Sequence, residues 1–352
     1  MSETTDVAIV GGGVSGLACA VRLRSLQPSL RVTIIESDHE VGGKVKGDLV
    51  SGCIVDGGPD LCVESKLNKT AAFGSLGLAS RLIPVNPRRL PTFKRHGHLL
   101  TEMPEVMTDG LVTFRGGMRE LVDTMTGALG EVDVRTSLRV NNVERSGTGY
   151  RVSAGKLSFV TRAVVAAIPA REFAGMMRSM FPRLADAVSP IRYDPITTVS
   201  AAWFRKDIPH PLRGTGYVAS CVVAGEVSAC TWTSSKIPSR SRENVILMRG
   251  FCRSADPVAS TRKVLDEMSR VLGISAAPLF TRAFGWGEGL PVYPADYDVR
   301  LPGYVRDAQL PDSFAIAGSA FHGIGIGDCI ASGERAAESI AAAIEQPTGV
   351  GA

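Results

Sequence analysis

Asp6-Val7-Ala8-Ile9-Val10-Gly11-Gly12-Gly13-Val14-Ser15-Gly16 has the pattern of a buried strand that turns directly into a helix. Its apolar residues predict a short strand, and the apolar residues within 17–23 predict a helix that begins just after the glycines. Gly11 permits a tight turn, Gly13 lets a phosphate approach the backbone, and Gly16 allows close packing of helix on strand. The turn is therefore a candidate phosphate-binding loop, in which backbone N–H groups at a helix N-terminus face an anion.

A second apolar strand and an acidic residue follow at the spacing of a dinucleotide-binding unit. Residues 31–35 predict this strand, and Glu36 comes twenty residues after Gly16. An acidic side chain at this place binds a ribose hydroxyl, and its charge disfavours the additional phosphate of NADP. A glycine-rich turn alone is a weak signal, because ordinary turns also contain glycine. Strand, helix, second strand and acid together predict a Rossmann-like unit.

Two further glycine pairs favour FAD over NAD. Val41-Gly42-Gly43-Lys44 follows the acid, and Asp56-Gly57-Gly58-Pro59 comes later. A long flavin cofactor that passes over the sheet needs small residues and backbone donors along its path, and Lys44 can place a positive charge near the pyrophosphate. The alternative is that these glycines only mark the turns of a hairpin.

The C-terminal part of the chain contains a second glycine-rich strand-to-helix turn. It includes Gly318 and the sequence Gly323-Ile324-Gly325-Ile326-Gly327, and a helical pattern follows. Such turns at both ends of one chain predict a cofactor that is bound at its nucleotide end by the first turn and at its reactive end by the last. FAD has this shape.

Longer motifs surround these turns. Residues 36–66 contain Val-Gly-Gly-Lys-Val and Gly-Gly-Pro-Asp-Leu-Cys-Val-Glu-Ser-Lys, and looser motifs occur at 76–78, 114–118, 164–169 and 233–238. Together with residues 317–337, they resemble the protoporphyrinogen and coproporphyrinogen oxidases of the flavin amine oxidase superfamily. The resemblance extends over nearly the whole chain and is most specific at its two ends.

The resemblance implies an FAD and a set of residues that contact it. The implied residues are Gly11, Gly13, Val14, Ser15, Gly16 and Glu36 for the nucleotide half, Gly42, Gly43 and Lys44 beside the pyrophosphate, Gly57, Gly58 and Pro59 against the isoalloxazine ring, Leu138 near the adenine, Gly318 by the ribityl-phosphate, and Gly325 and Ile326 at the pyrimidine edge. A helix N-terminus at that edge would stabilise the negative charge of a reduced flavin. None of the seven cysteines has a context that resembles covalent flavin attachment, so we expect non-covalent FAD.

The chain departs from the family between Pro104 and Phe114, where only nine residues occur. Full-length porphyrinogen oxidases carry a large helical insertion there, which binds the membrane and helps to form the substrate cavity. We therefore expect no stable membrane anchor. The substrate cavity is also expected to lack one wall, so the sequence does not decide whether the protein acts on the substrate of the family. A partner protein or a homodimer could supply that wall.

Composition excludes several classes of function. The net charge of +4 is spread over 39 basic and 35 acidic residues without a dense basic block, so nucleic-acid binding is not expected. The longest apolar stretches are strand-length, too short for a spanning helix. The first strand begins at Asp6, which leaves no room for a signal peptide, so we expect a cytoplasmic protein. The five histidines are scattered and no C-x-x-C pair occurs, so no metal site is expected.

These patterns predict an α/β protein with two interleaved domains. A three-layer, Rossmann-like FAD-binding domain is expected from residues 1–83, 113–169 and 300–345. A smaller α+β substrate domain is expected from residues 84–112 and 170–299.

Catalytic residues are harder to predict, because a flavin accepts the hydride itself. Flavin amine oxidases commonly have a lysine near the reactive nitrogen, and the aligned position here is Val199. His322 and Tyr293 are candidates near the ring, with a solvated loop position as the alternative for His322. Arg88 and Arg89 could bind a substrate carboxylate or remain solvated.

Three functions follow from these expectations. The first is an FAD-dependent oxidase or dehydrogenase that removes hydrogen from a C–C or C–N bond of a reduced ring, with oxygen as the acceptor. The second is a desaturase or imine-forming oxidase that acts on a smaller secondary metabolite. The third is a non-catalytic flavoprotein subunit.

Overall fold

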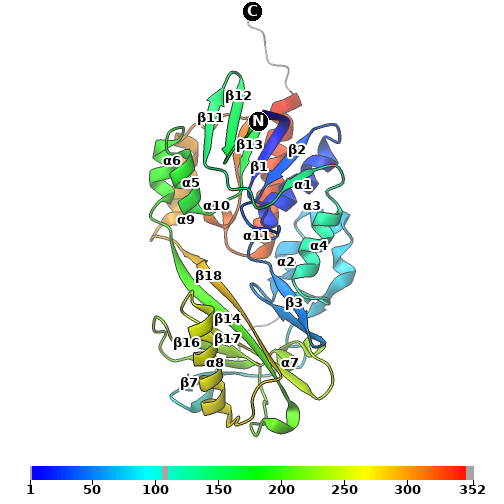
Figure 1. Ribbon diagram of the computed structural model, residues 1–352, viewed down its shortest axis with the longest axis vertical. Coiled ribbons are helices and arrows are strands. Elements are labelled where there is room, and N and C mark those ends of the chain that lie inside the picture. The colour runs from blue at the N-terminus through cyan, green and yellow to red at the C-terminus, as the bar shows by residue number, and fades with distance from the viewer. Residues whose placement is uncertain (1, 105–109, 346–352) are drawn as a thin grey trace, which may run out of the picture.

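A computed structural model describes residues 2–104 and 110–345 of the protein. Most of its strands lie in two seven-stranded sheets, one in the upper and one in the lower half of Figure 1. Two long strands run from the lower sheet toward the upper half of the molecule.

The first sheet is mainly parallel at its centre. Strand β1 (Ser2–Val10) lies between β2 (Val32–Ile35) and β13 (Leu157–Ala166) and is parallel to both. β10 (Asp133–Arg135) and β19 (Phe314–Ile316) extend the parallel part, and β11 (Asn142–Ser146) and β12 (Gly149–Ala154) add an antiparallel edge. The buried β-branched residues of β1, β2 and β13 fit a sheet that is covered on both faces.

Helices cover both faces of this sheet. Helices α1 (Val14–Leu26), α4 (Arg119–Gly127) and α11 (Ile326–Glu345) bury apolar residues against one face. The short helices α5 (Ala170–Met177) and α6 (Pro182–Val188), together with α9 (Tyr297–Asp307), pack on the other face. The result is the three-layer arrangement that the sequence predicted, and the α/β fold class is confirmed.

The second sheet is built around the two longest strands. β14 (Arg192–Phe204) lies between β17 (Val245–Cys252) and β18 (Phe280–Val292) and is antiparallel to both. The sheet continues through β16 (Val227–Thr231), β15 (Gly216–Ala219), β7 (Thr92–His96) and β8 (Leu99–Glu102). Helix α8 (Pro257–Leu272) covers one face, with Asp256 as its N-cap and Gly273 in the left-handed conformation at its end.

Smaller elements connect the two sheets. They are the hairpin β3 (Gly47–Val50) and β4 (Cys53–Asp56), the three-stranded sheet β5 (Cys62–Val63), β9 (Leu111–Phe114) and β6 (Leu82–Pro84), the helices α2 (Glu64–Leu67), α3 (Ala71–Ser75), α7 (Thr233–Lys236) and α10 (Ser319–His322), and the 3-10 helices Leu78–Arg81, Arg205–Asp207 and Pro238–Arg240.

The strands of the two large sheets follow the sequence ranges predicted for the two domains. Helices α5 and α6, which the prediction placed in the second domain, pack on the first sheet instead. The exact domain boundaries stay a prediction. Among the described residues, no helix is both long enough and apolar enough to span a membrane.

Candidate functional site

The turn between β1 and α1 is built by two glycines that have no room for a side chain. A Cβ on Gly11 would lie 2.4 Å from the carbonyl oxygen of Ala167, and Gly11 has a φ of +102°. A Cβ on Gly16 would lie 2.0 Å from the carbonyl oxygen of Gly11. These glycines therefore let β1, α1 and the end of β13 approach closely, as the sequence predicted.

At two further glycines, Gly13 and Gly318, a side chain would meet only ordinary van der Waals contacts. The nearest described atom to a Cβ on Gly13 would be Gly43 Cα, at 4.0 Å, and the nearest to a Cβ on Gly318 would be Ser15 Oγ, at 3.9 Å. Gly13 also forms a parallel bridge with Gly42. We call Gly13, Ser15, Gly42, Gly43 and Gly318 the glycine cradle, because backbone from three distant segments meets there.

The start of α1 fits an anion in this cradle. Gly13 is the N-cap of the helix, and no side chain of the described residues caps it with a hydrogen bond. The first turn, which holds Val14 and Ser15, contains no acidic residue. Uncapped N–H groups together with the helix dipole stabilise a phosphate at this position. The residues present therefore fit the pyrophosphate of a dinucleotide.

Glu36 lies directly beside the cradle at the carboxyl end of β2. Only 9% of the residue is exposed, and its carboxylate accepts hydrogen bonds from the backbone N–H of Gly12 at 2.7 Å and of Asp38 at 2.8 Å. The backbone N–H of Leu138 donates to the Glu36 carbonyl at 2.8 Å. The structure thus brings together Glu36, one of the residues predicted for the nucleotide half, and Leu138, predicted near the adenine, which lies in the segment after β10.

The side chain of Lys44 contacts residues of the two longest strands, β14 and β18. Its ammonium group donates to the Gly289 carbonyl at 2.8 Å and lies 5.1 Å from the centre of the Tyr193 ring. Burial lowers the pKa of Lys44, which the negative charge of Glu288 partly opposes. Lys44 therefore contacts the second sheet in this structure, and its predicted role beside the pyrophosphate stays a prediction.

The loop of residues 56–60 is held between the two sheets. The Gly57 carbonyl accepts hydrogen bonds from Thr198 Oγ1 at 2.7 Å and from Trp286 Nε1 at 3.0 Å. A Cβ on Gly57 would lie 2.6 Å from the Phe284 ring, and one on Gly58 would lie 1.8 Å from the Lys44 carbonyl oxygen. Packing inside the protein thus explains why residues 57 and 58 are glycines. Their predicted contact with a flavin, and that of Pro59, stays a prediction.

Val199, the position aligned with the lysine of flavin amine oxidases, is fully buried in the apolar core beneath α8. Its neighbour Thr198 faces the 56–60 loop instead. No cationic side chain therefore occupies position 198 or 199 on this strand.

The C-terminal turn lies against the first helix. A Cβ on Gly333 would lie 2.0 Å from the Ser15 carbonyl oxygen, so α11 and α1 are in direct contact. The Gly318 N–H donates to Ser332 Oγ at 2.9 Å. Gly325 and Ile326 begin α11, where Asp328 in the first turn forms an ion pair with Lys66 at 2.6 Å. Two glycine-rich turns that are far apart in sequence therefore meet beside one another, as Figure 1 shows for α1 and α11.

The two catalytic candidates lie close to this turn. Tyr293 donates a hydrogen bond to the Ser319 carbonyl and stacks on Tyr297, with the ring centres 5.1 Å apart. Burial raises the pKa of Tyr293, as does the nearby Tyr193. Burial, and secondly the charge of Arg335, lower the pKa of His322 to about 4, although more than a third of the residue remains exposed. His322 is thus a neutral, weakly basic side chain at pH 7.

Arg88 and Arg89 lie on an exposed segment beside α7. The segment is attached there by Asn86, whose N–H donates to the Lys236 carbonyl at 2.8 Å. Lys236 in turn contacts Asp60 in the 56–60 loop. These contacts link the segment that carries the two arginines to the predicted flavin loop. Binding of a substrate carboxylate by Arg88 and Arg89 stays a prediction.

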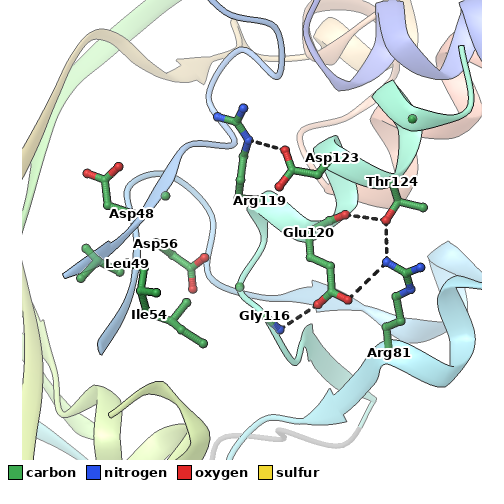
Figure 2. Close-up of a pocket in the computed structure, with 14 residues that line it drawn as sticks. Asp48, Leu49, Ile54, Asp56, Arg81, Gly116, Arg119, Glu120, Asp123 and Thr124 are labelled. Atoms are coloured by element: carbon green, nitrogen blue, oxygen red, sulfur yellow. Dashed lines mark hydrogen bonds and ion pairs between the residues drawn. The ribbon is translucent and has the colours of Figure 1, made fainter. Parts of the chain in front are cut away.

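The cavity in Figure 2 lies between the β3–β4 hairpin and α4, has a volume of about 750 Å³ and touches the 56–60 loop only at Asp56. None of the predicted cofactor-binding residues lines it. Its charged residues pair with one another, for example Arg119 with Asp123 at 2.8 Å and Arg81 with Glu120 at 3.4 Å. We therefore assign the functional site to the glycine cradle and the 56–60 loop rather than to this cavity.

The sequence did not point to the side chains that hold the 56–60 loop. They are Thr198, Lys236, Arg240, Arg249 and Trp286. Each comes from a segment far away in the chain, so the sequence around residues 56–60 does not identify it, although Lys236 lies within the motif at 233–238.

Comparisons with known proteins identify the family of the chain. Residues 94–341 match the family of flavin containing amine oxidoreductases, and residues 9–72 match the NAD(P)-binding Rossmann-like domain. The first match covers well over half of the chain. The implied cofactor is a flavin.

Curated relatives are coproporphyrinogen III and protoporphyrinogen oxidases. The coproporphyrinogen III oxidase of Propionibacterium freudenreichii subsp. freudenreichii is 28% identical over 240 residues, which cover 65% of this chain and 44% of the relative. The chain thus spans less than half the length of that relative in the alignment. The Bacillus subtilis enzyme of the same name is 21% identical over 457 residues, covering 94% of this chain and 96% of the relative. The predicted resemblance to these oxidases is confirmed.

Solved structures share the fold. A protein from Exiguobacterium sp. 255-15, provisionally named a protoporphyrinogen oxidase, superimposes with a TM-score of 0.83 at 18% identity, covering 98% of this chain and 99% of the other. Cyclohexylamine oxidase from Brevibacterium oxydans IH-35A superimposes with a TM-score of 0.78 at 13% identity, covering 97% and 100%. With the family match over residues 94–341, these comparisons lead to one conclusion: the chain belongs to the flavin containing amine oxidoreductase family.

Proposed function

We propose that this protein is an FAD-dependent oxidoreductase that removes a hydride from a C–C or C–N bond of a partly reduced ring. The observation that carries the proposal is the glycine cradle, where an uncapped helix N-terminus lies at Gly13 and where side chains on Gly13 and Gly318 would meet no tight contact. The names of the curated relatives supply the reduced ring as the substrate class.

In this proposal the glycine cradle binds the pyrophosphate of a non-covalent FAD, and Glu36 binds a ribose hydroxyl. The bound flavin supplies the hydride acceptor. The 56–60 loop and the start of α11 orient the cofactor from two sides, and Tyr293 fixes the C-terminal turn through the Ser319 carbonyl. Oxygen is the proposed final acceptor of the electrons.

His322 does not serve as the proton acceptor in this proposal. A group with a pKa of about 4 accepts protons poorly at pH 7. Hydride transfer from an electron-rich reduced ring would need positioning from the protein, and the proton that the oxidised ring then loses would pass to water.

A second candidate is oxidation of a smaller secondary metabolite. It is favoured by the short segment after Pro104, because the sequence has nine residues between Pro104 and Phe114 where the porphyrinogen oxidases carry a large insertion. Residues 105–109 of this segment lie outside the described part of the structure. The absence of the insertion removes one wall of a tetrapyrrole-sized cavity.

Anaerobic mixing of the FAD-loaded protein with substrates tests these candidates. We would add coproporphyrinogen, protoporphyrinogen or a small cyclic amine and follow flavin absorbance and porphyrin fluorescence. Bleaching with a porphyrinogen, accompanied by porphyrin fluorescence, supports the first candidate. Bleaching with the amine alone supports the second. A flavin that only a chemical reductant bleaches indicates a non-catalytic flavoprotein, and peroxide formed on admitting air identifies oxygen as the acceptor.

A further inference from the structure

Five charged side chains lie together at the 56–60 loop, and two of them, Asp56 and Asp60, belong to the loop itself. Asp56 forms an ion pair with Arg240 at 3.1 Å, and Asp60 forms one with Lys236 at 3.2 Å. The fifth side chain, Arg249 on β17, lies 4.0 Å from Asp60. We call these residues the loop cluster. Arg240 and Arg249 are 0% and 3% exposed, so the cluster is shielded from solvent.

Arg249 differs from the other cations of the loop cluster. The guanidinium N–H groups of Arg240 donate hydrogen bonds to Asp56, to the Phe114 carbonyl at 2.9 Å and to Thr113 Oγ1 at 2.7 Å. Arg249 donates from Nη2 to the Gly58 carbonyl, but its buried Nε and Nη1 have no hydrogen-bond partner among the described residues. Burying a guanidinium with unpaired N–H groups costs free energy of folding.

The loop cluster contains three cations and two carboxylates. The charges that act most strongly on Asp56, Asp60 and Arg249 come from within the cluster itself. Asp56 and Asp60 are each paired with another cation at close range, so the uncompensated positive charge belongs to Arg249. In a solvent-shielded region this charge acts over a longer distance than at the surface.

Arg249 donates a hydrogen bond to the Gly58 carbonyl, in the loop where the family resemblance places the isoalloxazine ring. Reduction of an oxidised flavin by a hydride adds one proton and two electrons, so the neutral ring becomes an anion. A nearby buried cation stabilises the anionic product more than the neutral reactant.

Resting on the proposed function, we propose that Arg249 is a positioning residue that holds the Gly58 carbonyl and, through the positive charge of the loop cluster, makes the bound flavin easier to reduce. Arg249 acts through the loop and need not contact the substrate. Asp60 is expected to make the bound flavin harder to reduce, because its carboxylate offsets part of the positive charge of the loop cluster.

Reduction potentials of the FAD-loaded variants R249M, R249K and D60N test this inference. For R249M we expect the two-electron potential to fall by about 30 mV or more, which is a tenfold change in the reduction equilibrium. R249K retains the charge and should keep most of the wild-type potential. D60N should raise the potential. A loss of local structure alone would not shift R249M and D60N in opposite directions.

R282M is the matched control. Arg249 and Arg282 both lie opposite Ser200 of β14, one on each side, so they share a face of the second sheet. The side chain of Arg282 differs because it is 47% exposed and pairs with Asp48. Solvent screens its charge, so its removal should leave the potential unchanged. Equal potentials for wild type, R249M and D60N, with FAD bound in each, would overturn the role of Arg249. A wild-type protein that binds no FAD would instead overturn the proposed function.

Discussion

Among the single residues of the site, Glu36 is expected to stabilise both the fold and the bound cofactor. Its carboxylate holds the backbone N–H groups of Gly12 and Asp38, and it is expected to bind a ribose hydroxyl. Replacing Glu36 by Ala should weaken FAD binding by about 1.5–3 kcal/mol, the usual size of a hydrogen bond to a charged group. It should also lower the melting temperature of the FAD-free protein, because the two N–H groups lose their acceptor. FAD titration and thermal melting measure the two effects, with Glu36→Gln as the conservative control. Unchanged FAD affinity would show that the ribose is bound elsewhere.

His322 provides a pH-dependent test. Its pKa is lowered from 6.5 to about 4 in the folded protein, so between these values the unfolded chain binds more protons than the native one. Its contribution to stability is therefore present above pH 6.5 and is lost as the pH falls toward 4. The variant His322→Asn should show a smaller loss of melting temperature over this range than the wild type. An equal loss of melting temperature in both proteins as the pH falls from 6.5 to 4 would contradict the lowered pKa of His322.

Some residues could be predicted and others could not. Gly11, Gly13, Gly16 and Glu36 belong to one contiguous βαβ pattern, so their spacing identifies them and the structure brings them together. The direction of the Lys44 side chain depends instead on Gly289 and Tyr193, which are remote in sequence. The loop cluster depends in the same way on contacts of the 56–60 loop with Lys236, Arg240 and Arg249, which are remote in sequence.

At the level of elements, the first turn offers a matched pair of glycines. Gly13 has φ −69° and ψ −178°, which any residue can adopt, and a Cβ there faces the glycine cradle. Gly16 has no such room. We expect Gly13→Val to keep the melting temperature of the FAD-free protein and to lose FAD affinity by tenfold or more, roughly 1.4 kcal/mol. Gly16→Val should destabilise the fold itself, by about 1–3 kcal/mol or more. Equal destabilisation by both variants would mean that Gly13 is structural.

The elements differ in how well their sequence predicts them. The ends of helix α8 can be predicted from the sequence, because Asp256 and Pro257 mark its start and Gly273 marks its end. β18 is harder to predict, since Gly285, Gly287, Gly289 and Pro291 weaken a strand pattern. The structure supplies the reason for two of these glycines: a Cβ on Gly285 would lie 2.7 Å from the Ala255 carbonyl oxygen, and one on Gly289 would lie 2.5 Å from that of Asp194.

At the level of the whole molecule, β14 and β18 connect the two halves of the protein. Thr198 on β14 and Trp286 on β18 both donate to the Gly57 carbonyl, so the second sheet holds the loop that is expected to carry the flavin. In Figure 1, β14 and β18 extend from the lower half toward the upper half. The general two-sheet organisation could be predicted from the order of motifs, but the contacts of β14 and β18 with the 56–60 loop could not.

The missing insertion leads to a prediction about membranes. Nine residues between Pro104 and Phe114 are too few for the membrane-binding helices of the porphyrinogen oxidases. We expect the protein to stay at the bottom of a flotation gradient with neutral liposomes. Strong flotation would mean that another surface of the protein binds lipid.

The central claim is that the glycine cradle binds a non-covalent FAD, and the flavin content of the purified protein tests it most directly. The FAD-loaded protein would be freed of unbound flavin, precipitated with acid and assayed for flavin in the supernatant and in the pellet. The account predicts about one FAD per chain, all of it released, because the cradle surrounds a single pyrophosphate position and no covalent attachment is expected. A protein that retains no FAD after reconstitution would contradict the cradle as a cofactor site, and flavin that remains in the pellet would contradict non-covalent binding.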